Sequence, residues 1–130
     1  MRDIGKFRGL RTDGGGWAYG YLFKIWEQAY ILWGTTNGVP NMVEVIPETV
    51  GEYTGKHDVN GKERLWEGDV IAMFQGTQRS EIFWDDEVAA WMVWAQLSGD
   101  TSVRKELLSN MISTSRKIGS IHDNRDLLSP

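Results

Sequence analysis

Short β-rich runs, each closed by a turn signal, recur along this chain and constrain its fold more than any other feature. Residues 17–22 place an aromatic side chain at every second position, which suits a strand. A glycine-rich turn signal at 12–16 precedes this run, and Asn60-Gly61, the strongest short-range hairpin signal, occurs further along. The pattern predicts a mostly β fold of many short antiparallel strands and hairpins.

The remaining elements follow from the same periodicity. The expected strands are residues 6–10, 17–22, 30–33, 42–46, 50–54, 66–74, 81–84 and 118–121. Residues 88–97 are apolar enough for a buried helix or a strand, and the pattern leaves both open. One C-terminal helix is predicted at 102–112, with Ser102 as its N-cap. A turn is expected at 122–124 and a short terminal cap at 125–128, and the seven Trp are expected to be mostly core.

Length and composition limit the possible classes of protein. A chain of 130 residues fits one domain, 1–130, and the absence of cysteine excludes disulfides and thiolate metal sites. The formal net charge of -4 argues against bulk attraction to nucleic acid or to an anionic membrane. The most apolar run, 88–97, is too short for a membrane span, and no signal peptide is apparent at the N-terminus. We therefore expect a soluble protein of the cytoplasm, without membrane contact.

Residues 53–70 hold the candidates for a metal or catalytic site. Glu67 and Asp69 would lie on one face of an extended strand, about 7 Å apart. With Asp58 or His57 from across the hairpin, they are weak candidates for metal ligands. The favoured interpretation is structural: Gly68 forms a turn, Asp69 bonds nearby backbone N–H groups, and Glu67 faces water. No cofactor, no metal and no catalytic residue is therefore assigned.

Other chemical motifs fail at named positions. A calcium loop beginning at Asp58 would place Lys62 at a ligand position and Glu63 where the loop needs glycine. Neither Gly-Lys pair in this stretch is followed by Ser or Thr, so neither is a phosphate loop. Ser120, His122 and Asp123 are close in sequence, but a triad needs convergence in space and an oxyanion hole. We expect no such triad.

Residues 49–71, TVGEYTGKHDVNGKERLWEGDVI, resemble the signature of the YopX family of phage and prophage proteins. That signature runs aromatic-Thr-Gly, a spacer with Asp, Asn-Gly-Lys-Glu, then an aromatic followed by Glu-Gly-Asp. The matching residues are Tyr53, Thr54, Gly55, Asp58, Asn60, Gly61, Lys62, Glu63, Trp66, Glu67, Gly68 and Asp69. Segments 6–8, 81–94 and 117–128 agree with the family in order, and the departures are Leu10, Ser120, His122 and Arg125.

The resemblance implies a mostly β fold with a small barrel-like core and a hairpin strand at 88–97. It also implies a product of a phage or integrated prophage, but it supplies no activity and no functional residues. The first hypothesis is a non-enzymatic binding or assembly module that forms a homo-oligomer or binds a phage or host protein. The second is a metal-dependent hydrolase or nuclease using Glu67 and Asp69. The third is single-stranded nucleic-acid binding on an aromatic strand face, which the acidic balance disfavours.

Overall fold

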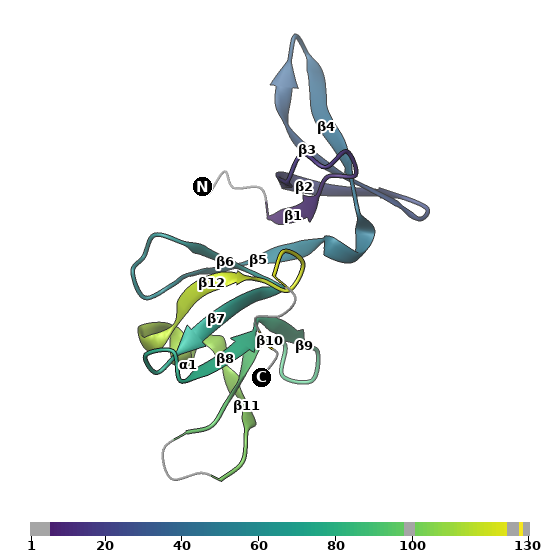
Figure 1. The fold of residues 1–130 in the computed structure, drawn as a ribbon. Helices are drawn as coiled ribbons and strands as arrows, with labels where there is room; N and C mark the ends of the chain where they lie inside the picture. The colour runs from purple at the N-terminus through teal and green to yellow at the C-terminus, as the bar shows by residue number, and fades with distance from the viewer. Residues whose placement is uncertain (1–5, 98–100, 125–127, 129–130) are drawn as a thin grey trace. The chain divides into compact units, whose positions relative to one another are not determined.

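The structure is a computed structural model that describes residues 6–97, 101–124 and 128. Two compact units divide the chain, Met1–Tyr53 and Thr54–Pro130, and both are built from antiparallel strands (Figure 1). The mostly β fold with one short helix near the C-terminus is thus confirmed. The single domain 1–130 stays a prediction. Within the described residues, no helix is long and apolar enough to cross a membrane.

The first unit is a sheet of consecutive hairpins. Its elements are β1 (Phe7–Leu10), β2 (Trp17–Ile25), β3 (Gln28–Thr36), β4 (Val39–Val45), the 3-10 turn η1 (Pro47–Thr49) and the beginning of β5 (Gly51–His57). The strands lie in the order β4-β3-β2-β1-β5. The hairpin predicted across the glycine-rich turn is present, since Leu10 pairs with Trp17 and Phe7 with Gly20.

One face of this sheet carries a buried apolar cluster. The buried cluster consists of Ala18, Ala29, Ile31 and Val45, and Phe7, Leu22, Val43 and Val50 pack against it. On β2 the buried residues are Ala18 and Gly20, which alternate with the aromatic positions. A Cβ at position 20 would come within 2.1 Å of the Leu32 carbonyl oxygen, so only glycine fits there. The small residues of β2 therefore face the core, and its aromatic residues face away from it.

The second unit begins with the rest of β5. Its other elements are β6 (Arg64–Trp66), β7 (Asp69–Met73), β8 (Gln78–Glu81), β9 (Phe83–Asp85), β10 (Ala90–Ala95), β11 (Arg104–Leu107), α1 (Leu108–Met111), η2 (Ile112–Thr114) and β12 (Arg116–Ser120). Strands β7 to β12 form two antiparallel three-stranded sheets, β11-β10-β9 and β12-β7-β8, and β6 pairs with β5. The core consists of Leu65, Ile71, Met73, Ile82, Val93, Ala95, Leu108 and Met111. Residues 88–97 contain β10 and no helix, as the family resemblance implies.

Two expectations need correction, and a third lies mostly outside the described residues. The helix predicted at 102–112 is wrong over its first half, because Arg104–Leu107 pairs with β10 as a strand and only Leu108–Met111 is α-helical. The helical spacing of apolar residues holds within α1, where Leu108 and Met111 pack into the core. The described sheets are open, so the predicted barrel-like core is only a loose description. The terminal cap at 125–128 lies, apart from Leu128, outside the described residues.

The tryptophans do not form the core that the sequence suggested. Of the seven, only Trp66 is buried, while Trp26, Trp33, Trp84 and Trp94 are exposed. In the second unit the exposed rings pair with neighbours instead. Trp84 meets Trp91 edge to face at 5.1 Å across the β9–β10 hairpin. Such pairs stabilise a hairpin from its solvent-facing side. The alternation of aromatic residues in the sequence is the same whether their rings lie on that side or in the core.

Candidate functional site

The signature stretch begins as a hairpin whose polar side chains bond the backbone. The Thr54 hydroxyl donates to the Leu65 carbonyl at 2.7 Å and accepts the Lys56 N–H at 3.1 Å. Gly55 lies between them at a φ of 82°, a left-handed conformation that favours glycine. This part of the motif therefore serves to join β5 to β6.

Asp58 organises the loop that closes this hairpin. Its side chain is buried, and Oδ1 accepts the Asn60 N–H at 3.2 Å. Its own N–H donates to the Glu63 carbonyl at 3.0 Å, and its carbonyl accepts the Gly61 N–H at 2.8 Å. The carboxylate is therefore used to hold the turn at Asn60-Gly61, as an Asx turn does.

Asp69 has a similar role in the next turn. It is fully buried, and its Oδ2 accepts the Trp66 N–H at 2.7 Å across the two residues that separate β6 from β7. The same oxygen lies 3.3 Å from Lys117 Nζ. Gly68, at a φ of 88°, forms the turn itself. The sequence favoured this backbone-bonding interpretation over a metal site.

Glu67, the other candidate carboxylate, is half-buried next to Glu81. Burial, and then the negative charge of Glu67, raise the pKa of the Glu81 carboxyl above its ordinary value. Asp69 does not join them as a third ligand, and His57 is exposed. No group of three or more His, Asp or Glu side chains that could hold a metal occurs among residues 6–97, 101–124 and 128.

The remaining motif residues divide by burial. Trp66 is buried in the second unit, whereas Asn60, Gly61, Lys62 and Glu63 are exposed on the loop between β5 and β6. Tyr53 belongs to the first unit, where its N–H donates to the Lys6 carbonyl at 2.7 Å. The signature thus combines two turns, a buried Trp and a solvated loop.

Ser120 is engaged in a turn. Its hydroxyl oxygen accepts the N–H groups of His122 at 3.1 Å and Asp123 at 3.2 Å, and it lies 3.4 Å from Asp123 Oδ2. These contacts form the turn that follows β12.

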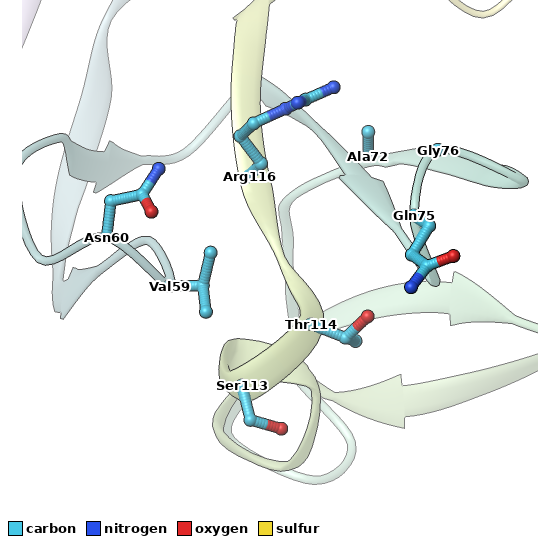
Figure 2. Close-up of a pocket in the computed structure, with 8 residues that line it drawn as sticks. All are labelled: Val59, Asn60, Ala72, Gln75, Gly76, Ser113, Thr114 and Arg116. Carbon is cyan, nitrogen blue, oxygen red and sulfur yellow. The ribbon is translucent and has the colours of Figure 1, made fainter.

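A polar pocket of about 430 Å³ lies in the second unit at the start of β12 (Figure 2). The polar pocket is lined by Val59, Asn60, Ala72, Gln75, Gly76, Ser113, Thr114 and Arg116. Figure 2 shows Arg116 on the strand between the loop of Val59 and Asn60 and the hairpin of Gln75 and Gly76. The Val59 N–H donates to the Ser115 carbonyl at 2.8 Å, and Ala72 pairs with Arg116. The signature loop therefore forms one wall of this pocket.

An exposed aromatic face is the main surface feature of the first unit. The aromatic face consists of Tyr19, Tyr21 and Phe23 of β2, Tyr30 and Leu32 of β3, and Met42 of β4. Strand register places these side chains together, because Tyr21 pairs with Leu32 and Leu32 pairs with Met42. The rings of Phe23 and Tyr30 lie 6.5 Å apart.

The sequence showed this row of aromatic residues but did not reveal its exposure. Tyr19 and Tyr21 are each 49% exposed, while Ala18 and Gly20 are buried between them. The size of Ala18 and Gly20 could have indicated which face is covered. Small side chains on one face of a strand allow a neighbouring strand or layer to approach closely. At the tip of the same hairpin Trp26 is 93% exposed at a φ of 52°.

Open antiparallel sheets and two turns, each held by a buried carboxylate, define a small, mostly β protein. The chain belongs to the YopX protein family, whose model matches residues 6–129. A search of curated proteins found no match to this chain.

Proposed function

We propose that this chain is a non-enzymatic assembly module that associates with a second copy of itself through the aromatic face. The observation that carries the proposal is the row of Tyr19, Tyr21 and Phe23, all more than 40% exposed on one side of β2. Contiguous exposed apolar surface of this kind is uncommon on monomers and marks interaction sites. Tyrosine is also enriched at the centre of protein interfaces.

The charge of the face favours a second copy as the partner. The register places Glu44 opposite Tyr30 and Arg8 opposite Tyr19 at its margins, and Arg8 is buried with its guanidinium 4.0 Å from the centre of the Trp17 ring. In a two-fold interface each patch meets its own copy, so a patch dominated by one charge would repel itself. The aromatic face has no such charge excess and is compatible with self-association.

The strands themselves also suggest a second covering layer. Strand β2 reads WAYGYLFKI, nearly continuously apolar, which is typical of strands covered on both faces. The small cluster around Ile31 and Val45 covers one face. A second copy packed on the other face would give a two-sheet sandwich with a core about 10 Å thick.

The hydrogen bonds of the two buried signature carboxylates support a protein without catalytic activity. Asp58 and Asp69 are buried and bonded to backbone N–H groups, which leaves neither placed to activate a water or hold a substrate. The metal-dependent hydrolase or nuclease remains a hypothesis, and calorimetric titration with Mn²⁺ tests it. As a part of this proposal, we expect the assembly to act inside a bacterial cell, because the resemblance to the family implies a phage or prophage origin.

Sedimentation velocity of charged variants tests the self-association. Tyr21→Lys and Phe23→Lys place a cation at the centre of the aromatic face, where two copies would repel each other, and both are expected to be monomeric. The matched control is Val39→Lys, at a position on β4 that is 64% exposed and three residues from Met42, hence on the opposite strand face. It is expected to assemble as the wild type does.

Two results would contradict the proposal. A wild-type chain that sediments as a monomer at every concentration tested removes self-association. Equal assembly by the wild type and the Tyr21→Lys variant places the interface elsewhere. A salt-sensitive gel shift with single-stranded DNA that is lost in the aromatic-face variants would replace the proposal with base stacking.

A further inference from the structure

The polar pocket of the second unit has a chemistry that the assembly proposal does not use. Its lining contains one charged side chain, Arg116, together with two carboxamides and two hydroxyls. No carboxylate of the described residues lines it. The electrostatic character of the pocket is therefore that of a cation surrounded by hydrogen-bonding groups.

Arg116 and its neighbour Lys117 are used differently. Lys117 Nζ lies 3.3 Å from the buried Asp69 carboxylate and 3.4 Å from the Arg64 carbonyl, so its charge is compensated within the fold. Side chains alternate along a strand, and Arg116 therefore projects from the other side of β12, opposite Ala72. Among the residues that the structure describes, no carboxylate pairs with the Arg116 guanidinium. Its five N–H donors are available to a ligand.

Thr114 contributes a hydroxyl donor. Its Oγ1 accepts the Phe74 N–H at 2.6 Å. A hydroxyl has one proton, and because the oxygen already accepts at this position, the proton is left to donate elsewhere. Thr114 lines the pocket, so this donor is available to a group bound there.

The hairpin between β7 and β8 holds Gln75 at the rim in an unfavourable backbone conformation. Phe74, Gln75 and Gly76 have φ values of 52°, 58° and 88°. The left-handed region is unfavourable for residues other than glycine, and such conformations persist where the surrounding structure fixes them. The bond from the Phe74 N–H to Thr114 is one such constraint. It ties the backbone of this hairpin to Thr114, and Figure 2 shows the Gln75 and Thr114 side chains on the same side of β12.

We propose that the polar pocket binds a small phosphorylated ligand, with Arg116 as the principal phosphate-binding residue. The planar guanidinium bonds two phosphate oxygens at once, and the Thr114 hydroxyl and the carboxamides of Gln75 and Asn60 supply donors for the others. A volume of about 430 Å³ lies within the range of small-molecule sites. The net charge of -4 gives a polyanion such as nucleic acid no long-range attraction, which favours a small ligand.

Titration of the full chain with inorganic phosphate, followed by ¹H–¹⁵N NMR, tests this site. The amide shifts are expected to cluster at residues 59–60, 74–76 and 113–116. Arg116→Gln is expected to weaken phosphate binding at least tenfold, roughly the loss of one charge-assisted hydrogen bond. The matched control is Arg104→Gln, which removes the same charge from an exposed position on β11 and is expected to bind as the wild type does.

Three outcomes would overturn the proposal. The first is the absence of saturable amide shifts in the pocket. The second is an equal weakening of phosphate binding by Arg116→Gln and Arg104→Gln, which would indicate that phosphate responds to the overall charge and not to a specific site. The third is a response to a single-stranded oligonucleotide without any response to phosphate, which would assign the surface to nucleic acid. Because the pocket and the aromatic face belong to different units, failure of one proposal leaves the other intact.

Discussion

Replacing Asp69 tests whether the signature motif is structural. Asp69→Ala removes the acceptor of the Trp66 N–H at 2.7 Å and the carboxylate 3.3 Å from Lys117 Nζ. Leaving a buried donor unpaired costs roughly 1–3 kcal/mol, and breaking a buried ion pair costs roughly 3–5 kcal/mol. Because the Lys117 side chain is 20% exposed and can reach water, we expect the lower end, about 3 kcal/mol in the free energy of unfolding.

Urea denaturation followed by tryptophan fluorescence measures this loss. If the 130 residues unfold as one cooperative unit, it corresponds to a fall in Tm of roughly 11 °C. Asp69→Asn keeps an oxygen acceptor for the Trp66 N–H but removes the charge, so it should lose less than Asp69→Ala. The difference between the two variants separates the hydrogen bond from the ion pair.

Glu63→Ala is the matched control for Asp69. Glu63 is an exposed carboxylate of the same motif, and only its backbone carbonyl takes part in the turn, accepting the Asp58 N–H. Its removal should change the free energy of unfolding by no more than about 0.5 kcal/mol. A loss below about 1 kcal/mol for Asp69→Ala would refute the structural role, since that is the low end of the cost of the unpaired N–H alone.

Two further predictions concern stability. Burial and Glu67 raise the pKa of Glu81 above 4.5, so the folded chain holds this proton more tightly and stability falls as the pH rises through that region. The Glu81→Gln variant should therefore be more stable than the wild type at pH 7, and this gain in stability should be absent below pH 4.5. Urea denaturation midpoints at the two pH values measure the gain. Midpoints that differ equally at both pH values would contradict the prediction. The Gly68→Ala variant should lose roughly 1–2 kcal/mol of folding stability because of its positive φ. It should lose more than Gly55→Ala, because the new Cβ would lie 3.3 Å from His122 Nε2, whereas position 55 has open space. Equal losses in thermal melts would show that the His122 side chain moves aside without cost.

Local chemistry was sufficient to predict the two turns of the signature stretch. Asn60-Gly61 and Gly68-Asp69 could be assigned from sequence because a glycine at positive φ and an Asp that bonds nearby N–H groups act over a few residues. The existence of most strands followed from their periodicity for the same reason. The boundaries of the C-terminal helix did not, because Arg104–Leu107 pairs with β10, a partner that helical spacing cannot reveal.

The polar pocket could not have been predicted from residue types alone. Its two walls come from the signature loop at Asn60 and the hairpin at Gln75, which meet only because both flank β12. In the sequence, Arg116 and Lys117 are two adjacent cations that nothing distinguishes. The alternation of the strand separates the two, directing one to a buried carboxylate and the other to the pocket.

The sequence by itself determined the class of fold, the two turns of the signature and the family, because these depend on local backbone preferences and on the order of residues. Tertiary structure alone decided which side of each strand is covered. Tyr19 and Tyr21 alternate as core residues do, yet they are exposed, because the sheet buries Ala18 and Gly20 against its own core instead. A period of two shows that the faces of a strand differ, but only the packing of the neighbouring elements determines which face meets water.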